Sequence, residues 1–280
     1  MTCPTLLLHL DDGPTCEQRT ALAIELARRH GAHLTALAAS GSIPISAVAG
    51  PGLLGVDTLT PALAHLRLQA SRRAGAFREQ ARAAGFEACD VLTDEDGDAD
   101  ALVRHSRSAD LLILGQADPA QPNASVNRRM VEEVVLQSAR PVLLIPFAGR
   151  FDRVGADVLV AWDDRREAAR AVADALPLLR ESQRVRVVRC ATALDDDSEA
   201  ARDAMAALQR WLGRHGVAAT VHTITTDVDP GNALLSRAAE WGCDLMVMGA
   251  YGHARWAERI LGGVTRTMLE TMTVPVLMSR

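Results

Sequence analysis

Apolar residues along the chain alternate between short continuous runs and longer stretches with helical spacing. Runs such as Thr5–Leu10 and Asp110–Gly115 are typical of strands that are buried on both faces of a sheet. Between them, the pattern of Cys16–His30 predicts a helix that ends at Gly31, a residue type favoured just after a helix. The alternation of strands and helices predicts an α/β fold in which parallel sheets are covered by helices on both faces.

Further elements of the first half follow from the same periodicities. Ser40–Thr60 is a Gly/Pro/Ala-rich insertion without a clear period. The acidic run Asp94–Asp100 does not place its carboxylates at the spacing of an EF-hand calcium loop, so we interpret it as a solvated loop that favours the N-terminus of the next helix. The remaining predicted strands are Leu34–Ala39, Ala88–Thr93 and Pro141–Ile145, and the remaining helices are Pro61–Ala84, Ala99–Arg107 and Arg129–Ser138.

The order of elements occurs twice in the chain. Asp157–Trp162 leads into Asp163 and Asp164 as Thr5–Leu10 leads into Asp11 and Asp12. A repeated order with fixed landmarks indicates an internal duplication, so we predict two domains, residues 1–148 and 156–280, joined by a short polar link. Three landmarks share one offset: Asp110, Gly115 and Pro141 recur as Asp244, Gly249 and Pro275.

Composition narrows the class of function. The chain has 280 residues, of which 48% are hydrophobic, 23% charged and only 3% aromatic, and its formal net charge is −5. Nucleic-acid binding depends on basic surface and is often assisted by aromatic stacking, so we do not expect a nucleic-acid partner. The five cysteines are scattered without a C-x2-C pair, which favours buried free thiols.

The chain is expected to be cytoplasmic. Its first residues show no basic region of a signal peptide before the first strand. The most apolar long run, Ile43–Val56, is interrupted by glycines and prolines and is too short to span a bilayer.

Glycines near the end of the chain are the strongest candidates for a ligand site. Gly249 follows a buried strand, Gly252 lies three residues later, and Gly262 and Gly263 precede a predicted helix at Val264–Met272. Free amides and the helix dipole at such an N-terminus favour an anion such as phosphate. The Walker motif is excluded because the chain has no lysine, and the G-x-G-x-x-G dinucleotide motif is also absent.

The pattern G-x2-G-x9-G, followed by Gly263, Val264 and Thr265, resembles the nucleotide motif of the universal stress protein family. Together with the duplication, it makes the chain look like a tandem universal stress protein. The resemblance implies two Rossmann-like, doubly wound domains, each with a mainly parallel five-stranded sheet of order 3-2-1-4-5. It also implies a pseudo-dimer in which the last strands, Pro141–Ile145 and Val274–Met278, bring the two halves together.

The same resemblance implies a ligand and its contacts. The ligand would be ATP or another adenine nucleotide, alone or with Mg²⁺, bound in the second half. Asp163 would lie beside the nucleotide, with a backbone group near Cys190 at the adenine. The other expected contacts are Met248 and Gly249 near the ribose, and Gly252, Gly262, Gly263, Val264 and Thr265 around the phosphates.

This chain departs from the family pattern in both halves. Gly263 replaces the usual Ser or Thr, and Asp164-Arg165 replaces the frequent Gly-Ser, so a second carboxylate approaches the site. In the first half only Gly115 is kept, and we expect a degenerate site there. The positions equivalent to Gly252, Gly262, Gly263 and Thr265 are Asp118, Arg128, Arg129 and Val131, with the two arginines at a solvated helix start.

Three classes of function are compatible with the sequence. The first is a nucleotide-binding regulatory protein of the stress response, with an unidentified protein partner and further homodimerisation left open. The second is an interaction scaffold that binds no nucleotide, and the third is a slow ATP hydrolase. The third would need a base or nucleophile, for which Asp163 and His253 are the candidates. His253, Arg255 and Arg259 could also meet the phosphates or belong to an exposed polar loop.

Overall fold

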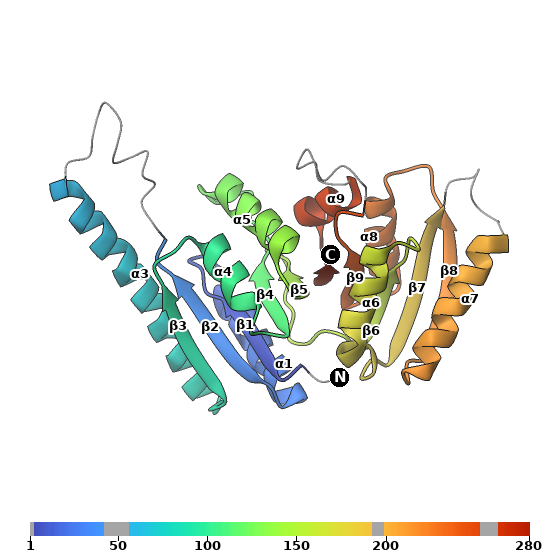
Figure 1. Cartoon of the computed structure of the whole chain (residues 1–280), viewed down its shortest axis with the longest axis horizontal. Coiled ribbons are helices and arrows are strands. Elements are labelled where there is room, and N and C mark those ends of the chain that lie inside the picture. The colour runs from blue at the N-terminus through green and yellow to red at the C-terminus, as the bar shows by residue number, and fades with distance from the viewer. Residues whose placement is uncertain (1–2, 42–55, 192–198, 253–262) are drawn as a thin grey trace.

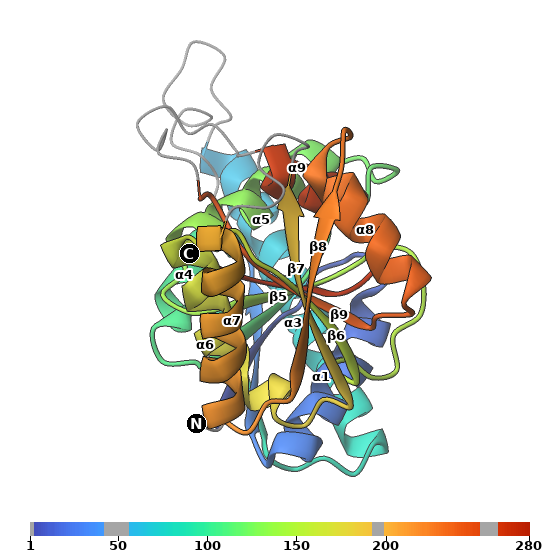
Figure 2. The same cartoon turned by 90° about the vertical axis from the view of Figure 1, so that its right-hand side faces the viewer.

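The computed structural model describes residues 3–41, 56–191, 199–252 and 263–280. These residues contain one sheet of ten strands in the order β3-β2-β1-β4-β5-β10-β9-β6-β7-β8 (Figures 1 and 2). Neighbouring strands are parallel except β5 and β10, which are antiparallel. The strands span Thr5–His9 (β1), His33–Ala39 (β2), Cys89–Asp94 (β3), Leu111–Gly115 (β4), Val142–Ile145 (β5), Asp157–Ala161 (β6), Arg184–Ala191 (β7), Ala219–Thr225 (β8), Leu245–Gly249 (β9) and Val276–Ser279 (β10).

Helices cover both faces of the sheet over two apolar cores. Leu6 and Leu8 of β1 enter the first core and Leu7 enters the second, because successive strand residues point to opposite faces. Within the described residues, no helix is both long and apolar enough to cross a membrane. The helices over the first core are Cys16–His30 (α1), Val56–Ala83 (α3), Arg166–Leu179 (α6) and Glu199–Arg214 (α7), and those over the second are Asp98–Ser106 (α4), Ala124–Gln137 (α5), Pro230–Glu240 (α8) and Gly263–Thr271 (α9).

The two halves of the sheet meet through their last strands. β5 and β10 pair with Val142 opposite Met278 and Leu144 opposite Val276. Each half has the strand order 3-2-1-4-5 that the family resemblance implies. The expected fold class and the pseudo-dimer are therefore confirmed, and Figure 1 shows this junction at the centre of the molecule. The division into domains 1–148 and 156–280 stays a prediction.

The repeated aspartates have a structural role at the start of each half. A carboxylate oxygen of Asp110 accepts the Thr5 amide at 3.0 Å. Asp244 accepts three consecutive amides, from Gly155 at 3.1 Å to Asp157 at 2.9 Å. In both halves a side chain just before the fourth strand thus ties down the beginning of the first strand, which explains why this landmark is repeated.

Two predicted helix starts are wrong. α3 begins at Val56 rather than Pro61, and α5 begins at Ala124 rather than Arg129. Proline is common in the first turn of a helix, so Pro61 was interpreted as a start although it lies inside α3. The first turn of α5 is solvent-exposed, with Val126 64% exposed, and therefore lacks the apolar period that marks a helix. Residues 42–55 of the predicted insertion lie outside the described residues.

The acidic run is only partly the solvated loop that we expected. Asp98 and Asp100 do lie in the first turn of α4. Asp94, however, ends β3 with its side chain only 11% exposed, and it pairs with Arg104 and, at 2.9 Å, with His105. Burial opposes ionisation, but these partners hold the pKa of the Asp94 carboxyl below its usual value. The carboxylate therefore ties β3 to α4.

The five cysteines carry free thiols. Cys3 is buried, and desolvation raises its pKa to about 11. The other four are half-buried, so the expectation of buried thiols is correct only for Cys3.

Candidate functional site

A cleft of about 400 Å³ opens at the carboxyl ends of β6, β7 and β9. Ligands of open parallel α/β sheets bind at this edge, where the loops after the strands leave a crevice. The first turns of α6, α8 and α9 complete its walls. Gly262 lies outside the described residues. The other eight predicted site residues line this one cleft: Asp163, Cys190, Met248, Gly249, Gly252, Gly263, Val264 and Thr265.

Gly249 is required for packing. A Cβ at this position would lie 2.5 Å from the backbone nitrogen of Ala168 and 2.6 Å from the carbonyl carbon of Glu167. Both atoms belong to the first turn of α6, which crosses directly over the end of β9. The absence of a side chain at Gly249 therefore allows the helix and the strand to touch, whether or not a ligand binds.

Gly252 and Gly263 are different because the space next to them is open. Among the described residues, a Cβ at Gly252 would have its nearest neighbours at 3.5–3.6 Å, and one at Gly263 would meet only Asp229, at 4.0 Å. Packing against the described residues does not demand glycine at either position. Gly263 is also the first residue of α9, where free amides and the helix dipole favour an anion. These two glycines are thus the ones that leave backbone accessible to a ligand.

Thr265 and Tyr251 join the start of α9 to the residues that follow β9. The buried Thr265 hydroxyl accepts the Tyr251 amide at 3.2 Å. Tyr251 has a φ of 62°, a left-handed conformation that is uncommon for a bulky residue. Its hydroxyl donates to the carbonyl of Glu132 in α5 at 3.1 Å, and burial raises its pKa well above the usual range. Tyr251 therefore ties the residues that directly follow β9 to the first half of the chain.

Charged side chains gather around Gly252 at one end of the cleft. A Cβ placed on Gly252 would lie 3.5 Å from a carboxylate oxygen of Asp163 and 3.6 Å from a carboxylate oxygen of the buried Glu167. Burial would raise the pKa of the Glu167 carboxyl, but its bond with Arg166 holds that pKa below the ordinary value. Arg165 donates to the Gly252 carbonyl at 2.9 Å. This end of the cleft thus combines open backbone, two carboxylates and a guanidinium.

Asp164 does not contribute a carboxylate to the cleft wall. It has a φ of 59°, a conformation that glycine adopts more easily, and it lines a separate hollow of about 230 Å³ below α7. The second carboxylate that we expected near the site is therefore that of Glu167 and not that of Asp164.

The other end of the cleft is more apolar. Val188, Leu234 and Met248 form its walls, and Cys190 adds a thiol. Desolvation, and secondly the charge of Asp229, raise the pKa of Cys190 to about 11, so its thiol stays protonated. A flat, largely apolar group with polar edges matches this mixture.

Sequence reasoning missed several residues of the cleft and its edge, including Arg165, Asp229, Glu167 and Trp162. Arg165 and Asp229 are helix caps in loops far apart in the chain, and Glu167 lies in a first helical turn where an acidic residue is ordinary. Trp162 follows β6, lines the cleft and is 9% exposed, and its buried indole nitrogen has no hydrogen-bond partner in the described part of the chain. Its place directly before Asp163 was the one available signal.

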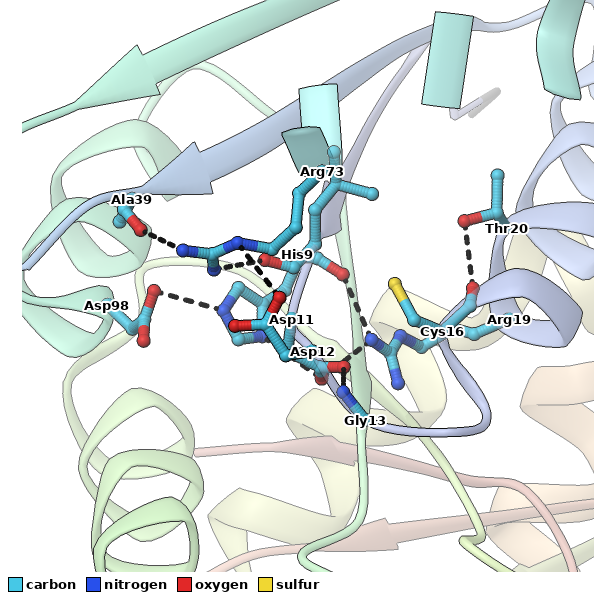
Figure 3. A network of polar contacts seen from close by, with 11 residues as sticks. His9, Asp11, Asp12, Gly13, Cys16, Arg19, Thr20, Ala39, Arg73 and Asp98 are labelled. Atoms are coloured by element: carbon cyan, nitrogen blue, oxygen red, sulfur yellow. Dashed lines mark hydrogen bonds and ion pairs between the residues drawn. The ribbon is translucent and has the colours of Figure 1, made fainter. Parts of the chain in front are cut away.

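In the first half, the equivalent region is filled by the protein's own side chains (Figure 3). Arg19 of α1 is 1% exposed and donates to Asp11 at 2.7 Å and to the His9 carbonyl at 3.2 Å. A Cβ at Gly115, the counterpart of Gly249, would collide with its guanidinium. The space that a ligand would need at the end of β4 therefore holds the buried Arg19 guanidinium, paired with the half-buried Asp11.

Two further residues close the first-half site from other elements. Arg73 of α3 donates to the carbonyls of Leu10 at 3.0 Å and Ala39 at 2.9 Å, which end the first two strands (Figure 3). The ring of His9 lies 3.2 Å from an oxygen of Asp98, at the start of α4. The strand ends are thus held by α3 and α4 instead of being open.

The positions expected to block the first-half site lie elsewhere. Arg128 and Arg129 are in the second turn of α5 and not at its start, and Arg128 pairs with Glu270 of α9 at 2.9 Å. Asp118 accepts the amide of Ala120 in its own loop, and Val131 is buried. These residues serve the loop, the core and the junction between halves, while Arg19 occupies the space beside Gly115.

Acid should destabilise the first half through this cluster. Burial raises the pKa values of the Asp11 and Asp98 carboxyls, but Arg19 and the His9 ring, respectively, hold them below the usual value. A carboxyl with a depressed folded-state pKa stabilises the fold above the unfolded pKa of about 3.9 and loses that contribution as pH falls through the folded pKa. We expect the urea midpoint, followed by circular dichroism, to fall between pH 6 and pH 3.

The matched variant for this pH effect is Asp98→Asn. It removes one ionisable partner of His9, so its midpoint should be below that of the wild type at pH 6 and closer to it at pH 3. An equal difference at both pH values would contradict the role of the ionised carboxylate.

Comparisons with known proteins agree with this geometry. The model of the universal stress protein family matches residues 156–280. A universal stress protein from Archaeoglobus fulgidus DSM 4304 is similar over 99% of this chain and 96% of its own, with 16% sequence identity and a TM-score of 0.75. A functionally unknown protein from Pseudomonas aeruginosa PAO1 covers 99% of this chain and 92% of its own, with 12% identity and a TM-score of 0.59. A search of curated proteins gave no match.

Proposed function

Since residues 156–280 belong to the universal stress protein family, we propose that the chain is a stress-response regulator that binds ATP or another adenine nucleotide in the cleft of its second half. The observation that carries this proposal is the convergence of the eight described site residues, from strands β7 and β9, helix α9 and the loops after β6 and β9, on one cleft. Convergence of residues that lie far apart in the sequence supports a shared ligand, because packing against the described residues explains only Gly249 among the three described glycines of the cleft.

The cleft suits a nucleotide in size and in the order of its surfaces. Its volume of about 400 Å³ lies in the range of small-molecule sites. The apolar end, with Val188, Leu234 and Met248, would hold the base. Gly252 and Gly263 at the other end would let the phosphates approach backbone amides at the start of α9.

We also propose that the nucleotide binds together with Mg²⁺. Asp163 and the buried Glu167 face the Gly252 end of the cleft, where they would repel a bare triphosphate. Carboxylates and phosphate oxygens are the ligands that Mg²⁺ prefers, and the cation would offset this repulsion. Asp163 is the residue that we expect to contact it.

Binding, rather than catalysis, is the function that the site favours. One oxygen of Asp163 accepts the backbone amide of Arg165 at 3.1 Å, and the other lies 3.9 Å from its guanidinium. Such a carboxylate is held as an orienting group and is poorly placed to act as a base. His253, the other candidate, lies outside the described residues. Tyr251, which contacts both the cleft loop and α5, offers a route from ligand to partner surface.

The decisive variant is Gly263→Val. A side chain here has room among the described residues and would extend from the cleft wall toward Asp229, into the space proposed for phosphate. We expect isothermal titration with Mg-ATP to show binding by the wild type and at least tenfold weaker binding by the variant, a change of about 1.4 kcal/mol. Bound nucleotide should also raise the melting temperature of the wild type.

Gly213→Val is the matched control. Gly213 lies in α7, has no atom within 4 Å of its Cβ position and does not line the cleft. It should bind Mg-ATP as the wild type does. Equal affinities of the wild type and Gly263→Val, or no binding by the wild type, would remove the nucleotide assignment and favour an interaction scaffold. We further propose a cytoplasmic site of action, where the five free thiols would stay reduced.

A further inference from the structure

Arg165 is the basic residue among the described residues that line the cleft. Its backbone is fixed, because its amide donates to Asp163 at 3.1 Å and it caps the N-terminus of α6. The side chain is 43% exposed and reaches across to the glycine loop, where it donates to the Gly252 carbonyl at 2.9 Å. A guanidinium thus lies at the end of the cleft where Gly252 leaves backbone open.

The contact of Arg165 with Gly252 can be exchanged for a stronger one. A solvent-exposed hydrogen bond to a neutral carbonyl contributes little net free energy, whereas bonds between a guanidinium and a phosphate are charge-assisted and often bidentate. Arginine geometry matches a phosphate group better than lysine geometry does. The side chain is therefore placed to turn from the carbonyl to an anion that enters beside it.

The surrounding charges make this guanidinium important for an anionic ligand. Carboxylate oxygens of Asp163 and Glu167 both lie within 3.6 Å of the Cβ position of Gly252, and Asp229 lines the cleft near Gly263. Without Arg165, an entering phosphate would meet carboxylates at this end, with the α9 amides as its main favourable contacts among the described residues. The affinity of a ligand that lacks phosphate would not depend on the Arg165 guanidinium in this way.

We propose that Arg165 makes the cleft selective for a phosphorylated nucleotide over the corresponding nucleoside, by exchanging its bond with Gly252 for bonds with phosphate. This inference rests on the proposed nucleotide site. It assigns specificity to a residue that replaces the serine frequent at this position of the family motif, and it leaves recognition of the base to the apolar end of the cleft. Arg165 is thus a direct ligand contact.

The test compares Mg-ATP with adenosine on the full-length chain. In Arg165→Gln we expect the Kd for Mg-ATP to rise at least tenfold, while the Kd for adenosine stays within about twofold of the wild-type value. Arg165→Lys keeps the positive charge but loses the planar guanidinium, so its Kd for Mg-ATP should lie between the values of the wild type and Arg165→Gln. Raising the salt concentration should weaken Mg-ATP binding more in the wild type than in Arg165→Gln.

Arg170→Gln is the matched control for net charge. Arg170 lies on the same helix, pairs with Asp174 at 2.8 Å and does not line the cleft, so its removal should leave both affinities unchanged. Equal losses for Mg-ATP and adenosine in Arg165→Gln, or an unchanged Mg-ATP affinity, would overturn the inference while the nucleotide site stands. A wild type that binds neither compound would overturn the proposed function and this inference with it.

Discussion

Gly249→Val is expected to destabilise the second half of the chain by about 3 kcal/mol or more. The Cβ position of Gly249 lies 2.5 Å from a backbone nitrogen and 2.6 Å from a carbonyl carbon of α6. Backbone atoms cannot rotate away as a flexible side chain can, so α6 would have to shift from β9. That shift would separate side chains of the first apolar core, to which α6 contributes buried residues such as Ala171 and Val172.

Tryptophan fluorescence can isolate this effect, because all four tryptophans lie in the second half of the sequence. Urea unfolding followed by that signal should show a clearly lower midpoint for Gly249→Val. The matched variant is Gly252→Ala, whose Cβ would sit at ordinary contact distances of 3.5 Å and more, and it should stay within about 0.5 kcal/mol of the wild type. Similar midpoints for Gly249→Val and Gly252→Ala would show that α6 does not depend on the missing side chain.

The two glycines illustrate what the sequence can predict about the site and what it cannot. Their spacing identified the loop and its partners, and the structure brings the described motif residues to one cleft. Spacing could not separate a glycine needed for helix packing from one that leaves backbone open. That distinction depends on how closely α6 crosses β9, which is a tertiary property.

Residues from distant loops were beyond the reach of sequence reasoning for a similar reason. Arg165, Glu167 and Asp229 belong to ordinary helix starts, and only the strand order places them around the same cleft. The strand order itself came from the family resemblance. By contrast, α1 was predicted correctly from Cys16 to His30, because its apolar period and Gly31, with a φ of 60°, are local signals.

The closed first-half site offers the second large effect, through the pair of the buried Arg19 and the half-buried Asp11. Asp11→Ala should cost about 3 kcal/mol, because it leaves the Arg19 guanidinium buried with only the His9 carbonyl as a described acceptor. Replacing both partners, in Asp11→Ala with Arg19→Met, removes the uncompensated charge and supplies an apolar side chain of similar length. The double variant should therefore be more stable than Asp11→Ala alone.

Circular dichroism is the suitable signal for this cycle, since the first half contains no tryptophan. Urea midpoints of the wild type, the two single variants and the double variant give the coupling free energy, which should be at least about 1 kcal/mol for groups 2.7 Å apart. Additive effects would mean that the pair contributes no more than its separate contacts. A large coupling would mean that the first half maintains its fold by keeping its own charge pair where the second half keeps an open cleft.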